Sequence, residues 1–268
     1  MQAEKICNHI TEWLVSYARQ ARMTGFVVGV SGGIDSAVTS ALCGRTGLDT
    51  LCLDLPIHQA KDQQSRALKH INALREIHGN VRGMSIDLSK PFDTWVEALP
   101  DSKHDTRQIA LVNSRARFRM TTLYYFAALE RKLVAGTGNK VEDFGIGFFT
   151  KYGDGGVDIS PIADLNKSEV YELGRYLHII DEIMSAPPTD GLWADNRTDE
   201  AQIGATYREL EWAMDFVERG GDESNLTTRQ RQVLQIYRTL HKANLHKIKP
   251  IPVCKIPEEW KGSGTGGK

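Results

Sequence analysis

The residues Ser31-Gly32-Gly33-Ile34-Asp35-Ser36 follow directly on an apolar run, 26–30, and lead into a helix-forming segment, 37–42. A strand, a glycine-rich turn and a helix start, in that order, form a cradle for an anion. The two glycines let backbone N–H groups turn inward, and the positive end of the new helix faces the same space. The two serines add hydroxyl donors. This stretch therefore predicts a phosphate-binding turn at the end of a strand.

Asp35 is the exception in this turn, because a carboxylate repels a bound phosphate unless a cation lies between them. Mg²⁺ is usually held by one or two carboxylates together with phosphate oxygens. The combination of phosphate turn and carboxylate therefore predicts a magnesium–nucleotide site.

Three other interpretations compete for the same residues. The Walker A pattern is not met, because no lysine follows the glycines. Residues 29–33 do match G-x-S-x-G, the nucleophile elbow of serine hydrolases, with Ser31 as the nucleophile. That elbow normally follows several earlier strands, whereas Ser31 ends the first candidate strand, and no His-Gly-Gly segment precedes it. The third alternative is a purely structural strand-to-helix turn.

Composition limits the classes of protein to consider. The chain has 268 residues, 41% apolar and 25% charged, with a formal net charge of -1. These values are ordinary for a globular protein and argue against binding of nucleic acid by charge. We expect no membrane span, no secretory signal and a cytoplasmic location. We expect one domain over residues 1–261, followed by a flexible glycine-rich tail, 262–268.

The cysteines Cys7, Cys43, Cys52 and Cys254 form no C-x-x-C pair. Cys43 and Cys52 lie within apolar stretches, which favours core positions over a disulfide or a zinc site.

The order of the predicted elements favours a doubly wound parallel sheet with helices on both faces, a Rossmann-like α/β fold. Helical spacing of apolar residues predicts a helix over 3–22, and further helices are expected over 59–77 and 105–131. Candidate strands are residues 26–30, 50–55, 82–88 and 132–136. Alternation of this kind is typical of βαβ units, whose ligands bind at the carboxyl ends of the strands.

A second polar segment follows the fourth candidate strand. The turn GTGNKVED, 136–143, again places glycines and a hydroxyl after an apolar strand, and Glu142 is a plausible second metal carboxylate. The segment FFTKYGDGG, 148–156, comes next and is followed by Asp158. A surface hairpin would explain its glycines, but a loop that closes on a polar ligand also explains the clustered charges Lys151, Asp154 and Asp158.

The turn SGGIDS resembles the pyrophosphate-binding loop, SGGxDS, of the N-type ATP pyrophosphatases. Together with GTGNKVE and FFTKYGDGG, in this order, it resembles ammonia-dependent NAD synthetase, and the similarity runs over nearly the whole chain. The resemblance implies an adenine nucleotide alpha-hydrolase-like fold and a homodimer with helices at the interface. It also implies that ATP adenylates the nicotinate carboxylate of deamido-NAD, after which ammonia displaces AMP. Because the chain has no room for an amidotransferase domain, we expect free ammonia rather than glutamine as the nitrogen source.

The resemblance also assigns roles to individual positions. ATP binding is expected at Gly29, Val30, Ser31, Gly32, Gly33, Ile34, Asp35, Ser36, Thr137, Lys167 and Thr189. Contacts to deamido-NAD are expected at Arg117, Lys151, Asp158, His246 and Lys247. Asp35 and Glu142 are expected to bind Mg²⁺. By sequence alone, Arg117 also fits an exposed helix arginine, and Lys167 fits a lysine in the first turn of a helix.

The chain departs from the family pattern at several positions. Gly138 and Val141 replace serines that many relatives carry, and Ile248 replaces an arginine after the His-Lys pair. The polar stretch 190–200 is expected to be a mobile lid. Two further alternatives stay open at this point: a GMP synthetase-like enzyme, and a nucleotide-binding sensor that does not release pyrophosphate.

Overall fold

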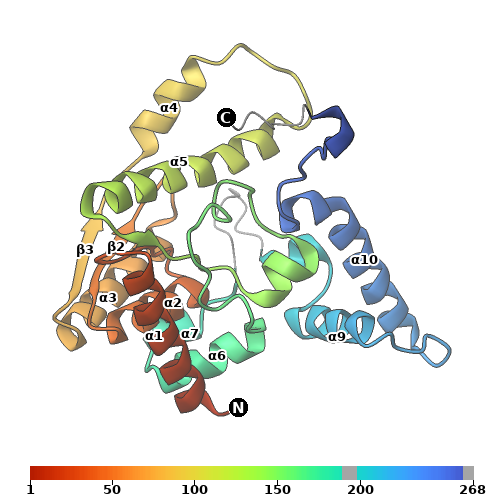
Figure 1. The fold of residues 1–268 in the computed structure, drawn as a ribbon, viewed down its shortest axis with the longest axis horizontal. Coiled ribbons are helices and arrows are strands. Elements are labelled where there is room, and N and C mark those ends of the chain that lie inside the picture. The colour runs from red at the N-terminus through yellow and green to blue at the C-terminus, as the bar shows by residue number, and fades with distance from the viewer. Residues whose placement is uncertain (189–197, 262–268) are drawn as a thin grey trace, which may run out of the picture.

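The centre of the computed structural model, which describes residues 1–188 and 198–261, is a parallel sheet of four strands in the order β3-β2-β1-β4 (Figure 1). The strands are β1 (Gly25–Gly29), β2 (Asp49–Asp54), β3 (Val81–Ser85) and β4 (Leu133–Val134). The predicted fold class is confirmed, and each strand overlaps a predicted one. The fourth strand is shorter than expected, because only two of its residues pair with β1 and Ala135 then forms an isolated bridge with Ile159.

The order of the strands reverses at β1. The chain moves outward from β1 to β2 and β3, and it then returns to place β4 on the other side of β1. The loops after β1 and β4 therefore leave the sheet in different directions at its carboxyl edge. In open α/β sheets this switch point is where ligands bind. It is also where the two predicted phosphate-type turns lie.

Helices cover both faces of the sheet. Those named here are α1 (Ala3–Gln20), α2 (Ile34–Arg45), α3 (Lys61–Ile77), α4 (Ser89–Glu97), α5 (Arg107–Glu130) and α6 (Lys167–Tyr176). One core cluster joins α1, α2, α3 and α6 to one face of the sheet, and another joins α4 and α5 to the other (Figure 1). Successive residues of β1 alternate between them: Phe26 and Val28 belong to the first cluster and Val27 to the second. This alternation follows from the period of two along a strand.

A third apolar cluster lies beside the sheet and is built from helices alone. It joins the π-helix η1 (Lys140–Ile146) to α9 (Tyr207–Glu218) and α10 (Thr228–Ile248). Capping boxes fix the starts of α9, with Thr206 and Glu209, and of α10, with Thr227 and Gln230. Two short helices, α7 (Asp181–Met184) and α8 (Asp199–Ile203), lie between α6 and α9 in the chain.

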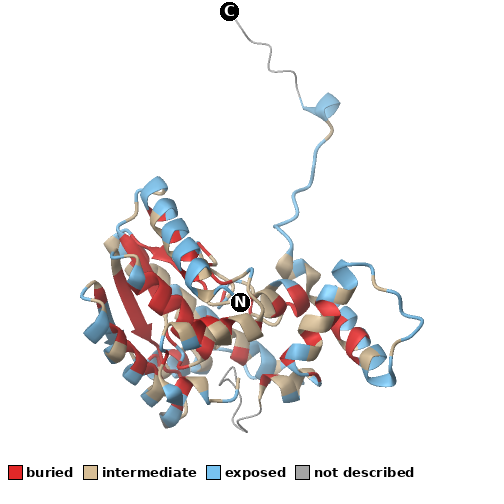
Figure 2. Ribbon diagram, turned by 90° about the horizontal axis from the view of Figure 1, so that it is seen from below, coloured by how far each residue is buried: buried red, intermediate tan, exposed pale blue. Residues whose placement is uncertain are grey.

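After α10 the chain runs away from the body in an extended segment that includes the 3₁₀ turn η2 (Glu258–Trp260) (Figure 2). Its apolar side chains are exposed, Ile251, Val253 and Trp260 among them. The predicted flexible tail, 262–268, lies outside the described residues. Within the described part of the chain, every helix is too short or too polar to cross a membrane.

All four cysteines are free, and three of them are buried. Cys43 and Cys52 lie in the core cluster that joins α1, α2, α3 and α6 to the sheet, as the sequence predicted, and so does Cys7. Burial raises the pKa of Cys7 to about 11, so its thiol is an unreactive core group. Cys254 is exposed in the segment after α10.

One histidine is buried between α2 and α3. The side chain of His70 is 1% exposed, and its Nε2 lies 2.9 Å from the hydroxyl of Ser40. Burial lowers the pKa of His70 to about 4. The imidazole is therefore neutral in the folded protein at pH 7, and its protonation opposes folding.

The stability of the protein should fall in mild acid because of His70. Its pKa is lower in the folded chain than the ordinary value of 6.5, so the unfolded chain binds the additional proton as the pH drops below 6.5. Between pH 7 and pH 5 this difference costs about 2 kcal/mol of unfolding free energy. Urea unfolding at both pH values should show that His70→Gln loses less stability than the parent protein. His9→Gln, at an exposed position of α1, is the control and should lose as much as the parent. Equal losses for the parent and for His70→Gln would contradict this origin of the acid sensitivity.

Candidate functional site

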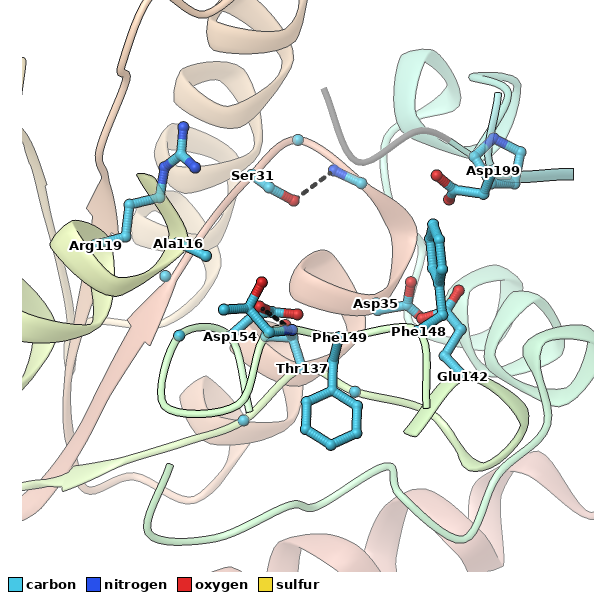
Figure 3. Close-up of a pocket in the computed structure, with 18 of the residues that line it drawn as sticks. Ser31, Asp35, Ala116, Arg119, Thr137, Glu142, Phe148, Phe149, Asp154 and Asp199 are labelled. Atoms are coloured by element: carbon cyan, nitrogen blue, oxygen red, sulfur yellow. Dashed lines mark hydrogen bonds between the residues drawn. The ribbon is translucent and has the colours of Figure 1, made fainter. Parts of the chain in front are cut away.

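A cavity of about 520 Å³ opens at the switch point of the sheet (Figure 3). Its walls come from the loops after β1 and β4, the carboxyl end of β2, the start of α3, one side of α5 and the segment 147–157. Further lining comes from the start of η1, from α6, α7 and the segment 186–188, from Asp199 and Gln202 of α8, and from Asn244 and Lys247 of α10. Segments from most of the chain thus meet where the strand order reverses.

The loop after β1 forms the floor of the cavity, and residues 29–35 line it. Gly32 has a φ of +81°, and a Cβ there would lie 2.6 Å from the carbonyl oxygen of Gln63, so this turn requires glycine. The backbone N–H of Gly33 donates to the Ser31 hydroxyl over 3.3 Å. Ser36, which was expected at the ATP site, is buried and does not line the cavity. Its hydroxyl accepts from the backbone N–H of Ser31 and donates to the carbonyl of Gly33, so it shapes the loop instead.

Three charged side chains from three elements converge beside this loop. Asp35 comes from the first turn of α2, Glu142 from η1 and Lys167 from the first turn of α6. The ammonium of Lys167 lies 2.5 Å from Asp35 Oδ2 and 2.9 Å from Glu142 Oε1. Figure 3 shows the two carboxylates side by side. The sequence predicted the two carboxylates as a pair, and the structure brings them to one point.

Asn139 links the two acidic residues. Its side-chain NH₂ donates to Asp35 Oδ1 over 3.1 Å, and its side-chain oxygen accepts from the backbone N–H of Glu142 over 3.1 Å. Asn139 is fully buried and caps the start of η1. π-Helical segments are rare and are concentrated at functional sites.

The pKa values of the two carboxylates are shifted in opposite directions. Burial raises the pKa of Asp35, and the neighbouring Glu142 adds to this, although Lys167 opposes it. Burial also acts to raise the pKa of Glu142, but Lys167 and the Tyr207 hydroxyl outweigh it, and the pKa is lowered. Burial acts to lower the pKa of Lys167, yet the two acidic neighbours raise it well above its ordinary value. Lys167 is therefore an ammonium, and the site holds cationic and anionic groups out of water.

The donor set fits a magnesium ion. Asp35 and Glu142 share the Lys167 ammonium and lie beside a phosphate-type turn. Mg²⁺ is usually bound by one or two carboxylates of this kind together with substrate phosphates. No group of three or more His, Cys, Asp or Glu side chains that could hold a metal occurs among the described residues. A metal cage made of protein ligands alone is therefore not formed by that part of the chain.

Sequence reasoning missed two residues that complete this cluster. The Tyr207 hydroxyl donates to Glu142 over 2.5 Å and lies 3.1 Å from Asp199 Oδ2. Tyr207 opens α9 and Asp199 opens α8, far along the chain from the glycine-rich turns. Neither lies in a recognisable motif, so only the packing of α8 and α9 beside η1 reveals them.

A second charged group lines the cavity near the segment 147–157. Asp154 accepts a hydrogen bond from the backbone N–H of Thr150, and burial raises the pKa of both Asp143 and Asp154. The ammonium of Lys247 donates to the carbonyl of Phe149 over 2.7 Å. The partly buried Arg119, drawn at the left of Figure 3, donates to the carbonyl of Leu55 over 2.9 Å. Sequence reasoning gave Arg119 no role in the site.

Most of the positions expected to contact deamido-NAD lie outside the cavity. Of these positions only Lys247 lines it, whereas Arg117, Lys151, Asp158 and His246 do not. Thr137, an expected ATP contact, also lines the cavity. Arg117 donates to the backbone carbonyl of Lys151, and the Lys151 ammonium donates to that of His246 over 2.7 Å. Asp158 accepts from the Tyr124 hydroxyl and from the backbone N–H of Val134, so it ties β4 to α5. Thr189 and most of the expected lid lie outside the described residues.

Two departures from the family pattern have a structural reason. A Cβ at Gly138 would lie 1.9 Å from Asp143 Oδ2, so the Asp143 carboxyl occupies the space that a side chain would need. Val141 is fully buried in the apolar cluster around α9 and α10, where a hydroxyl would find an apolar environment.

The geometry disfavours a serine hydrolase. The Ser31 hydroxyl lies 3.2 Å from that of Ser36, and the described lining of the cavity contains no histidine. A nucleophilic serine needs a base within hydrogen-bond distance. The Ser31 hydroxyl instead accepts from the backbone N–H of Gly33, in the floor of the cavity.

Comparison with known proteins gives one consistent result. The model of the NAD synthase family matches residues 6–251. An NH₃-dependent NAD⁺ synthetase of Carboxydothermus hydrogenoformans is 39% identical over 78% of this chain and 83% of its own. Among solved structures, an NMN synthetase from Francisella tularensis has a TM-score of 0.81 at 31% identity, over 96% of this chain and all of that one. An NH₃-dependent NAD synthetase from Campylobacter jejuni has a TM-score of 0.76 at 26% identity, over 95% of this chain and all of that one.

Removing the ammonium from the cluster should destabilise the fold. Lys167→Met removes a buried ammonium and leaves two partly buried carboxylates facing each other, and breaking a buried ion pair typically costs about 3–5 kcal/mol. Urea unfolding in a metal-free buffer should therefore show a loss of at least about 3 kcal/mol. Lys140→Met removes a partly exposed pair with Glu218, 3.7 Å long, and should cost less than about 1 kcal/mol. Equal stability of the two variants would contradict the charge balance described here.

Proposed function

The chain belongs to the NAD synthase family and is therefore a ligase that forms a C–N bond, and we propose that it does so in the cavity at the switch point. Enzymes of this family join ATP, deamido-NAD and ammonia to give NAD, AMP and pyrophosphate. The observation that carries the proposed location is the meeting of Asp35, Glu142 and Lys167 beside the glycine-rich turn. An ATP-binding and metal-binding role for this cluster is a proposal.

The first step brings two anions together, the nicotinate carboxylate and the α-phosphate of ATP. The start of α2, beside the glycine-rich turn, would receive phosphate oxygens. Lys167 stays an ammonium in a buried site, where electrostatic stabilisation is strong, and we propose that it turns from the two carboxylates to the ATP phosphates. Asp35 and Glu142 would hold Mg²⁺, which, when bound, neutralises charge on the phosphates. The residues thus position two reactants and offset their repulsion, with no covalent enzyme intermediate.

In the second step ammonia displaces AMP from the adenylated carboxylate. This requires neutral ammonia close to an intermediate that water would otherwise hydrolyse. The cavity lies between the sheet and the helices α5, α8 and α10. The curated relative from Carboxydothermus hydrogenoformans is named as NH₃-dependent, and we propose the same nitrogen source for this chain.

The acceptor would enter from the side of the segment 147–157. Arg117, Lys151 and His246 are joined by hydrogen bonds through their backbone carbonyls at that side. We propose that they contact the part of the dinucleotide that extends beyond the cavity, with Lys247 at the rim and Asp158 supporting the strand. Thr137 and Thr189 are proposed as ATP contacts. The Francisella tularensis neighbour is named as an NMN synthetase, so the mononucleotide form of the acceptor is a second candidate substrate.

One assay tests this function. Purified protein with ATP, Mg²⁺, ammonium and deamido-NAD should release AMP and pyrophosphate in equal amounts with NAD, and glutamine should not replace ammonium. A parallel reaction with deamido-NMN measures the preference between acceptors.

Asp35→Asn should keep the fold and lose about 100-fold or more in rate, because the metal contributes several kcal/mol of charge stabilisation. Pyrophosphate release without an amide product, or full activity of Asp35→Asn, would contradict the proposal.

We also propose a homodimer that packs through α5. Near its end this helix exposes two large apolar side chains one turn apart, Tyr125 at 62% and Leu129 at 63%. Neighbouring exposed apolar side chains of this kind are a feature of protein interfaces. The four free cysteines are consistent with a reducing compartment, and we propose a cytoplasmic location.

A charge on the outer face of α5 should dissociate the dimer. In sedimentation velocity the parent protein should run as a dimer, and Leu129→Glu should shift it to a monomer, because a buried unpaired carboxylate is costly at an interface. Ile77→Glu introduces the same charge at an exposed apolar position at the end of α3 and should leave the dimer intact. A dimer that survives Leu129→Glu would place the interface elsewhere.

A further inference from the structure

Tyr207 connects the helices beside the sheet to the charged cluster. Its side chain is buried, and its hydroxyl donates to Glu142 Oε1 over 2.5 Å. Its ring lies beneath the ammonium of Lys167, with 4.8 Å between the nitrogen and the ring centroid. One side chain therefore contacts both the acidic residue and the cation that share this site.

The position of Tyr207 is fixed by its own surroundings. A capping box of Thr206 and Glu209 sets the first turn of α9, and the ring packs into the apolar cluster with Leu210 and Met214. Asp199 Oδ2 lies 3.1 Å from the hydroxyl on its other side. Burial and the charge of Glu142 raise the pKa of Tyr207, so the group is a phenol and a donor. A donor held in place by α9 thus faces the Glu142 carboxylate.

If the Lys167 ammonium leaves Glu142 for the ATP phosphates, the Glu142 carboxylate needs another hydrogen-bond donor to keep its orientation. In the structure Glu142 Oε1 accepts from both Lys167 and Tyr207. In the proposed reaction Lys167 turns to the ATP phosphates, and its hydrogen bond to Glu142 is weakened at that moment. The Tyr207 hydroxyl does not depend on the nucleotide and continues to hold the carboxylate. Hydrogen-bond partners of this kind fix the orientation of metal-binding carboxylates.

We infer that Tyr207 is a positioning residue, which holds the Glu142 carboxylate toward Asp35 so that both can bind one divalent ion together with ATP. The inference rests on the proposed function, since it concerns the same metal site. It goes further by assigning a role to a residue of α9 that belongs to neither glycine-rich turn. The chemistry that it serves is binding of a hard divalent cation by oxygen ligands.

The first test measures metal affinity without turnover. Mn²⁺ is titrated in the presence of a non-hydrolysable ATP analogue, and free Mn²⁺ is read by its EPR signal. Tyr207→Phe keeps the ring and its packing but loses the hydroxyl. We expect its Mn²⁺ affinity to be about 10-fold to 100-fold weaker than that of the parent protein. Tyr237→Phe makes the same change at another buried tyrosine of the same apolar cluster, and it should bind Mn²⁺ as the parent does.

The second test separates positioning from damage to the fold. If Tyr207 acts through the metal site, the Mg²⁺ concentration for half-maximal rate should rise in Tyr207→Phe, and excess Mg²⁺ should restore most of kcat. A general packing defect would not be rescued by Mg²⁺ and would overturn the inference. Mn²⁺ affinity of Tyr207→Phe within twofold of the parent would overturn it while leaving the proposed function intact. Absence of Mn²⁺ binding by the parent itself would overturn both.

Discussion

The arrangement of the site depends on the balance of charge among Asp35, Glu142 and Lys167. Each of these groups is costly to remove from water alone, and each lies within hydrogen-bond distance of an oppositely charged partner. The three come from α2, η1 and α6, so their pairing also ties together segments that are far apart in the chain. Asn139 and Tyr207 add hydrogen bonds to the same carboxylates. The cluster is thus a structural junction as well as the candidate catalytic centre.

The sheet explains why these three groups can meet. Reversal of the strand order at β1 separates the loops after β1 and β4, and the space between them admits the starts of α2 and η1. Both turns begin where a strand ends, so their polar residues point to the same edge. The apolar alternation of Phe26, Val27 and Val28 anchors β1 from both faces and keeps this edge in place.

The sequence predicted the parts of the site that lie in local patterns. A strand, a glycine-rich turn and a helix start follow one another in adjacent residues. Asp35 and Glu142 lie within the two segments that have this pattern. The sequence did not predict Tyr207, Asp199 or Arg119 as site residues. Their positions depend on how helices pack in space, and the order of helices along the chain does not give the distances between them. Ser36 was assigned to the nucleotide from its motif, yet its hydroxyl is used within the loop. Arg117, Lys151 and His246 were taken from family resemblance, and the cavity does not include them.

The position of the Lys167 ammonium between two carboxylates affects the order in which ligands bind. The Lys167 ammonium already lies between Asp35 and Glu142, so it competes with any free divalent ion for these two carboxylates. A metal ion that arrives on a triphosphate brings further negative charge, to which the displaced lysine can turn. In the proposed reaction a divalent ion would therefore gain more by entering with the nucleotide than by entering alone.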